Sequence, residues 1–218
     1  MKIRIGTFNL FQFVEPPFSW YTKKEKFIPD EWEEKTTWIK NQIEKMNCDI
    51  IGFQEVFSKN ALKELLLEKG FKYFKTIDKA KVDKKNELIY VSTTVALASK
   101  FPIKSLKKVD VDFSSLKKHN VEGFFKFARE PIKATIILPN QKEINFYVCH
   151  LKSNRENEFE YIFTKSDKLE DKLKKVEVAL KNNYSLSLKQ RLCEASSLYS
   201  NIKANKKHSI LVCDLNDK

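Results

Sequence analysis

The sequence lacks any long uninterrupted run of apolar residues. Nowhere in its 218 residues does an apolar stretch approach the roughly eighteen residues that a membrane-spanning helix requires. Residues 1–6 have the pattern of a strand, and they lack the apolar core and the cleavage site of a secretory signal peptide. We therefore expect a cytoplasmic protein with no transmembrane segment and no export signal.

Cysteine is scarce, and no two cysteines are closely spaced. The chain has Cys48, Cys149, Cys193 and Cys213. Zinc fingers take their ligands from pairs about two to four residues apart, so this spacing argues against a structural zinc site. Three of the four lie in or beside strongly apolar runs, where a thiol behaves as a small hydrophobic side chain. We predict that the cysteines are reduced and buried.

Acidic residues are outnumbered by basic ones, which gives a net charge of +12 and an isoelectric point of about 9.4. A basic protein concentrates phosphates near its surface, so the charge favours a polyanionic partner, with nucleic acid as the first candidate. A protein that simply uses lysine as its default solvated residue would carry the same charge, and composition leaves both explanations open. Length and a hydrophobic content of 42% predict a single domain over residues 1–218.

The residue pattern predicts strands and helices along the whole chain. Runs rich in β-branched and aromatic residues predict strands over residues 2–9, 49–56, 71–76, 88–99, 130–138, 143–149 and 208–213. Apolar residues at helical spacing predict helices over residues 29–46, 59–70, 167–181 and 188–202. Residues 104–127 are basic and aromatic with few helix signals, and we expect a functional or mobile connection there. This order predicts a mixed two-sheet core flanked by helices.

Polar side chains stand at the ends of the predicted apolar strands, where an α/β sheet presents its polar groups to a ligand. Four of these ends are marked by Asn9, Glu55, Arg129 and His150. The last predicted strand runs directly into Asp214 and Asn216, whose separation by one residue directs both side chains to the same face of an extended chain. We expect these six residues to form one phosphoester-cleaving site.

Six short motifs stand in a fixed order along the chain. They are TFNL at residues 7–10, DIIGFQEV at 49–56, ALASKFPI at 96–103, REP at 129–131, HLKS at 150–153 and DLND at 214–217. This series resembles the endonuclease/exonuclease/phosphatase family, which includes pancreatic-type deoxyribonucleases, abasic-site endonucleases, sphingomyelinases and inositol-phosphate phosphatases. The resemblance implies an α/β fold, a four-layer α/β/β/α sandwich of two mixed sheets. The family usually has glycine before the aspartate of the last motif, where this sequence has Cys213.

The resemblance implies that Glu55 and Asn9 hold the catalytic metal. A hard divalent ion such as Mg²⁺ prefers oxygen ligands and keeps several waters, which suits one carboxylate and one side-chain amide oxygen. Mn²⁺ and Ca²⁺ are the alternative ions. Taken alone, Glu55 is equally explained as an exposed charge at a strand end, and Asn9 as a residue of a turn.

The remaining motif residues are implied to act on water and on the phosphate. Asp214 would orient or deprotonate the attacking water, and Asn216 would donate a hydrogen bond to the phosphate. His150 would serve the phosphate or the departing oxygen, since an imidazole titrates close enough to neutral pH to donate a proton. Arg129 carries a planar fork that can hold two phosphate oxygens. In isolation, a turn explains Asp214 and Asn216, and an internal hydrogen bond explains His150. A salt bridge to Glu130 or Glu122 explains Arg129.

Beyond its last motif here, the family pattern continues to an Asp-His pair, and this sequence stops before it. We therefore expect the last part of the second sheet to be missing, an unpaired sheet edge, and severely reduced turnover of this chain.

The function that the residues favour is a metal-dependent phosphodiesterase of endonuclease or exonuclease type that acts on nucleic acid. Lysines and phenylalanines in residues 107–127 suit a phosphate backbone with stacked bases, although solvated lysines over an aromatic core explain them as well. The alternatives are a phosphomonoesterase or lipid-headgroup phosphodiesterase, with a phosphorylated small molecule or a lipid headgroup as substrate, and a noncatalytic phosphate-binding fragment. The residues do not indicate an oligomeric state.

Overall fold

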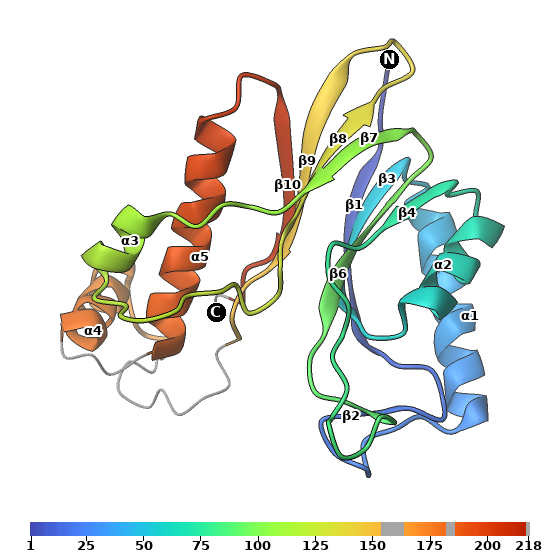
Figure 1. Ribbon diagram of the computed structural model, residues 1–218, viewed down its shortest axis with the longest axis horizontal. Coiled ribbons are helices and arrows are strands. Elements are labelled where there is room, and N and C mark those ends of the chain that lie inside the picture. The colour runs from blue at the N-terminus through green and yellow to red at the C-terminus, as the bar shows by residue number, and fades with distance from the viewer. Residues whose placement is uncertain (154–163, 182–185, 217–218) are drawn as a thin grey trace. The chain divides into compact units, whose positions relative to one another are not determined.

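The computed structural model describes residues 1–153, 164–181 and 186–216, and the chain divides into two compact units (Figure 1). Unit 1 comprises Met1–Val109, Arg129–His150 and Asn205–Asp214, and unit 2 comprises Asp110–Ala128, Leu151–Ala204 and Leu215–Lys218. Among the described residues, no helix combines the length and the apolar character needed to span a membrane. The single domain over residues 1–218 stays a prediction.

The first sheet of unit 1 has the strand order β1-β3-β6-β4. Its strands are β1 (Ile5–Phe13), β3 (Ile50–Val56), β6 (Thr94–Ser99) and β4 (Tyr73–Lys75). β1 runs parallel to β3, and β6 runs antiparallel to both of its neighbours. Every residue of β6 is buried, which explains why its sequence is nearly continuous in apolar and small residues instead of alternating.

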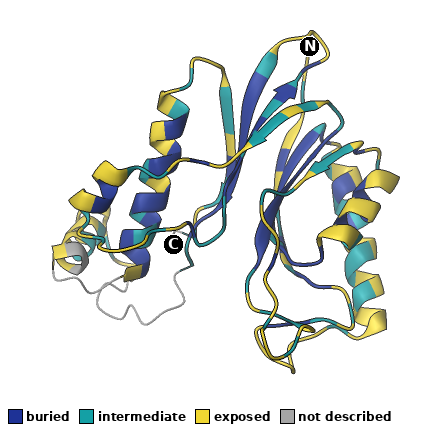
Figure 2. Cartoon of the chain, in the orientation of Figure 1, coloured by how far each residue is buried: buried dark blue, intermediate teal, exposed yellow. Residues whose placement is uncertain are grey.

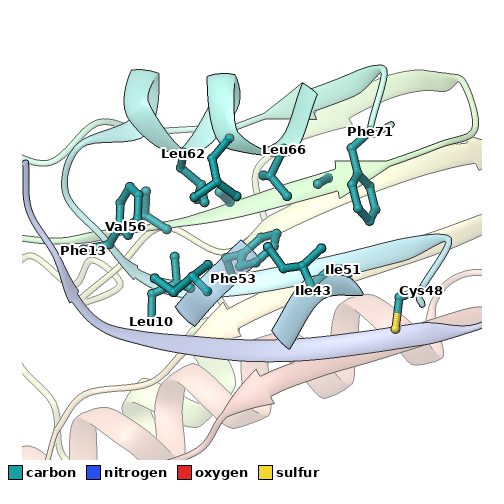
Figure 3. Packing of buried hydrophobic residues seen from close by; sticks show 14 residues of the cluster. Leu10, Phe13, Ile43, Cys48, Ile51, Phe53, Val56, Leu62, Leu66 and Phe71 are labelled. Carbon is teal, nitrogen blue, oxygen red and sulfur yellow. The ribbon is translucent and has the colours of Figure 1, made fainter. Parts of the chain in front are cut away.

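Helices α1 (Pro29–Met46) and α2 (Lys59–Glu68) cover one face of the first sheet. Pro29 suits the first turn of α1 because it has no N–H to leave unpaired there. Ile39 and Ile43 of α1 are buried together with Leu62 and Leu66 of α2 against the strands. Figure 3 shows Ile43, Leu62 and Leu66 in this packing. The opposite sides of both helices are exposed (Figure 2). The predicted helical stripes are therefore confirmed.

The second sheet of unit 1 has the strand order β10-β9-β8-β7. Its strands are β7 (Ile103–Lys107), β8 (Ile132–Ile137), β9 (Glu143–His150) and β10 (Ser209–Asp214). β10 pairs parallel with β9, while the other two pairs are antiparallel. Among the described residues, β10 is an edge strand. The two sheets share a core built from Ile50, Val95, Leu97, Ile132, Ala134, Ile136, Phe146, Val148 and Val212. The predicted α/β fold with two mixed sheets and flanking helices is confirmed.

Two shorter strands, β2 (Ser19–Trp20) and β5 (Ile89–Tyr90), pair in a small separate sheet of unit 1. Residues 88–99, predicted as one strand, are thus divided between β5 and β6.

Unit 2 contains the helices α3 (Phe113–Lys118), α4 (Leu169–Lys181) and α5 (Leu186–Lys203). Residues 104–127, predicted as a long connection with few helix signals, contain regular structure. Their first residues belong to β7, and the Asp112 carboxylate caps α3 by accepting from the Ser114 N–H.

The prediction of four reduced cysteines is wrong for one pair. Cys149 of β9 and Cys213 of β10 are register partners on adjacent strands and form a disulfide. Register partners present their side chains to the same face of a sheet, a proximity that a sequence separation of 64 residues conceals. Cys48 and Cys193 are free and buried, as predicted. The cytoplasmic location stays a prediction.

Candidate functional site

Three of the predicted site residues meet around one side-chain amide in unit 1. Asn9 of β1 donates from Nδ2 to the Asp214 carboxylate at the end of β10, with an N–O distance of 2.7 Å. The same nitrogen lies 3.5 Å from Oε1 of Glu55 on β3. The parallel pairing of β1 with β3 sets Asn9 beside Gln54, one residue before Glu55. The structure thus brings two carboxylates and one carboxamide from three strands to a single point.

The backbone around this point has an unusual conformation. Pairing between β1 and β3 shifts register between Asn9 and Phe13, and Phe11, Gln12 and Glu55 have positive φ angles of 48°, 63° and 58°. Two hydrogen bonds hold this bulge, from the Phe11 N–H to Asn9 Oδ1 and from the Gln12 N–H to Glu55 Oε2, both at 2.9 Å. Left-handed backbone at residues with side chains is costly, and it persists at functional sites where the surroundings enforce it.

His150 stands at the end of β9 as the register partner of Asp214. Its Nε2 lies 3.8 Å from Asp214 Oδ2, which is too long for a hydrogen bond, and its side chain is only 2% exposed. Nδ1 is buried and has no hydrogen-bond partner among the described residues. Burial, and to a smaller degree the Arg129 charge, lowers the pKa of His150 to about 4, against the opposing effect of Asp214. The imidazole is therefore neutral at pH 7, whereas the sequence led us to expect titration near neutrality.

We predict that the stability of the metal-free protein falls as the pH falls from 6.5 to 4. Unfolded His150 binds a proton over this interval that the folded form excludes, because its pKa drops from 6.5 to about 4 on folding. The free energy of unfolding should change by at most about 1.4 kcal/mol per pH unit. Urea unfolding at pH 4.5, 5.5 and 6.5 in EDTA measures this slope. The slope should shrink in His150→Gln and persist in His208→Gln, which alters an exposed histidine. Equal slopes in both variants would contradict the assignment.

The two remaining predicted site residues lie in different units, Arg129 in unit 1 and Asn216 in unit 2. Arg129 precedes β8 in unit 1, and it lies near enough to His150 to lower the pKa of that imidazole. Glu130, a candidate salt-bridge partner of Arg129, instead lies 3.3 Å from the Lys108 ammonium. Asn216 belongs to unit 2, where its side chain donates to the Leu151 carbonyl at 2.9 Å. Its predicted role at the phosphate stays a prediction.

Lys35 is a cation of the site that the sequence did not reveal. From α1 its ammonium donates to the Phe11 carbonyl at 2.7 Å and lies over the rings of Phe11 and Phe27. Burial lowers the pKa of Lys35, and the Glu55 carboxylate acts in the opposite direction. The available signal was its spacing, since Lys35 lies three residues after Trp32 and four before Ile39, on the same side of the helix.

Glu194 of α5 is a second residue that the sequence did not reveal. It is 1% exposed, and its two carboxylate oxygens accept from the backbone N–H groups of Ala128 and Lys152, each at 2.7 Å. Gln190 also donates to it, at 3.0 Å. These acceptors fix the chain immediately before Arg129 and two residues after His150.

The oxygen donors of the site suit a hard divalent cation. Glu55 and Asp214 present two carboxylates to the Asn9 amide nitrogen, and the Asn9 amide oxygen, which accepts from the Phe11 N–H, is a further oxygen of the site. The described residues contain no cluster of three or more His, Cys, Asp or Glu side chains placed to hold a metal. Mg²⁺ does not need such a cluster, because proteins usually bind it through one or two carboxylates together with waters and substrate phosphates.

Solved structures match this chain, although no family model and no curated protein does. An endonuclease/exonuclease/phosphatase from Beutenbergia cavernae DSM 12333 matches with a TM-score of 0.56 and 15% identity, over 98% of this chain and 47% of that chain. The human Nocturnin catalytic domain matches with a TM-score of 0.53 and 16% identity, over 86% and 58% of the two chains. ANGEL2, a 2',3'-cyclic phosphatase, matches with a TM-score of 0.50 and 14% identity, over 97% and 52%. This chain spans about half the length of these structures and has the fold of endonuclease/exonuclease/phosphatase proteins.

Proposed function

We propose that this chain, which has the fold of endonuclease/exonuclease/phosphatase proteins, is a divalent-metal-dependent phosphoesterase that cleaves phosphodiesters in nucleic acid. The observation that carries the proposal is the meeting of Glu55 and Asp214 at the Asn9 amide, with His150 beside Asp214. The site of a phosphoester hydrolase needs carboxylates for a cation and a base for water, and these residues supply both.

Each residue has a role that follows from its chemistry. Glu55 would hold Mg²⁺ together with the Asn9 carboxamide oxygen, and the bound ion would neutralise phosphate charge and acidify water. Asp214 carries a carboxyl group whose oxygens could orient or deprotonate the attacking water. Neutral His150 can donate one hydrogen bond to a phosphate oxygen or accept a proton, but it does not carry a charge at pH 7. Arg129 would grip two phosphate oxygens and disperse the negative charge of the transition state.

Three observations support a phosphate of nucleic acid as the substrate. The net charge of +12 attracts polyanions. The human Nocturnin catalytic domain, which shares the fold, was solved with a bound sulfate anion, and sulfate is tetrahedral like phosphate. ANGEL2 is a 2',3'-cyclic phosphatase, a phosphoesterase on the same fold. A nucleic-acid phosphodiester has both properties: it is polyanionic, and it contains the phosphoester bond that the residues of the site would cleave.

A substrate panel tests the proposal. We expect hydrolysis of bis(4-nitrophenyl) phosphate and of a labelled single-stranded oligonucleotide that requires Mg²⁺ or Mn²⁺ and stops in EDTA. Oligonucleotide binding should weaken steeply with salt, because bound lysines and arginines release counterions. Cleavage of 4-nitrophenyl phosphate alone would indicate a phosphomonoesterase instead. Tight, salt-dependent binding with no hydrolysis under any metal would overturn the enzymatic proposal and favour a phosphate-binding fragment.

A further inference from the structure

A cavity of about 240 Å³ lies on the second sheet of unit 1, apart from the candidate active site. β7, β8 and β9 line it together with the residues just before β10. Asn145 of β9 is at its wall, five residues before His150 in the same strand. A strand rises about 3.3 Å per residue, so the two residues lie roughly 16 Å apart along the strand. The cavity is therefore separate from the site around Asn9.

The wall of the cavity contains a buried hydrogen-bond donor that has no acceptor among the described residues. Asn145 is 3% exposed, and it is the register partner of Thr135 on β8. The Thr135 hydroxyl donates to Asn145 Oδ1 at 3.2 Å. Asn145 Nδ2 then has no partner among the described residues. A buried N–H without an acceptor is rare, because desolvating it is costly, and such a group commonly marks the position of a bound molecule.

The cavity also carries an excess of positive charge. Four lysines line it, namely Lys104, Lys107, Lys133 and Lys207, whereas Glu143 is the one carboxylate in the lining. Glu143 lies within salt-bridge distance of Lys104 and Lys207, and these contacts lower its pKa to about 2. The carboxylate is therefore ionised at neutral pH and neutralises one ammonium group at most. Lys133, whose ammonium lies 6.0 Å from the centroid of the Tyr147 ring, and Lys107 contribute further positive charge.

We propose that this cavity binds a phosphate group, with Asn145 Nδ2 as a neutral donor and Lys107 and Lys133 as charged donors. Phosphate is a strong acceptor, and hydrogen bonds from ammonium groups to its oxygens are short and strong. Glu143 would hold Lys104 and Lys207 at the rim while repelling the anion from its own position. The phosphate belongs either to free inorganic phosphate or to the backbone of a bound nucleic-acid strand, and both present the same tetrahedral oxyanion.

Removing the two charged donors is the first test. In an Arg129→Gln background, which weakens phosphate binding at the candidate active site, we compare Lys107→Gln/Lys133→Gln with Lys63→Gln/Lys72→Gln. The second pair removes the same charge from two exposed positions outside the cavity. Calorimetric titration with inorganic phosphate should give about a tenfold or larger rise in Kd for the first pair only. Equal Kd values in the two pairs would overturn the proposal.

Removing the neutral donor is the second test, and it separates binding from structure. Thr135→Val/Asn145→Leu replaces the hydrogen-bonded pair by apolar groups of similar shape. Without phosphate the Tm should not fall, because a buried N–H that lacks an acceptor has been removed. In the same Arg129→Gln background, millimolar phosphate should raise the parent Tm by more than it raises the Tm of this variant, because the variant has lost one of the donors in the cavity. An equal phosphate-induced rise in both proteins would contradict a role for Asn145.

The two sources of the phosphate give different results with a single-stranded oligonucleotide. If the cavity binds the backbone of a strand, the salt dependence of oligonucleotide binding should lose about 0.7 from its logarithmic slope in Lys107→Gln/Lys133→Gln, because the two lysines contact one phosphate and each phosphate contact contributes about 0.7. If it binds free phosphate, the slope should stay constant while the phosphate Kd rises. Both results support a phosphate-binding site in the cavity. Neither measurement depends on catalysis, so the proposed enzymatic function can fail without affecting this test.

Discussion

Replacing Glu55 by Gln is expected to lower the metal-dependent hydrolysis of a phosphodiester by at least about a hundredfold. Mutating residues that merely support metal ligands commonly costs about 10–100-fold in affinity or activity, and a ligand should cost at least as much. Gln keeps the size of Glu55 and an oxygen that can accept from the Gln12 N–H, so the left-handed backbone at this position keeps its hydrogen bond. What the variant loses is the negative charge that faces Asn9 and Lys35.

Metal binding provides a readout that does not depend on turnover. Titration with Mn²⁺, followed by calorimetry, should show a loss of affinity in Glu55→Gln of a size similar to the loss of activity. Glu64→Gln is the matched control, since Glu64 is an exposed carboxylate on α2. An unchanged Mn²⁺ affinity in Glu55→Gln, together with wild-type hydrolysis, would rule out this carboxylate as a ligand.

Local residue patterns predicted the helices and strands whose buried face can be read from the sequence. The apolar stripe with Ile39 and Ile43 was enough to predict α1, and the β-branched residues were enough to predict β8 and β9. Each pattern indicates which face of the element is buried. The region from β7 to α3 was not predicted. β7 begins directly after a proline and carries two lysines among its five residues, so its strand character depends on pairing with β8 and not on local propensity.

The sequence predicts those residues of the candidate site that lie at the ends of strands, because these strand ends converge. Asn9, Glu55, His150 and Asp214 come from different strands, and the placement of polar residues after apolar runs was enough to select them. The cross-strand register was not visible, so the pairing of Cys149 with Cys213 was missed although it adjoins two site residues. Burial was not visible either, and it is burial that lowers the pKa of His150.

Gly52→Ala is expected to lower the free energy of unfolding by about 3 kcal/mol or more. Gly52 lies in β3, where the two sheets approach closely. A Cβ added there would lie 2.4 Å from Cγ2 of Val212 and 3.0 Å from both γ carbons of Val148. Valine is stiff about χ1, so neither side chain can turn away without a clash, and the sheets must separate or the strands must shift. Overpacking a tightly packed core typically costs about 1–3 kcal/mol and sometimes more.

The same shift should reach the candidate site, because Val148 and Val212 each lie two residues before a site residue, His150 on β9 and Asp214 on β10. We therefore expect Gly52→Ala to weaken Mn²⁺ binding as well as lower the Tm, measured by calorimetry and thermal unfolding. Adding Val212→Ala should restore much of the stability by removing the 2.4 Å contact. Gly70→Ala is the control for a strained backbone alone, since its φ is +85° with open space around it, and it should cost only about 1 kcal/mol. A Gly52→Ala protein that melts at the wild-type temperature would show that the two sheets are more loosely packed than this geometry requires.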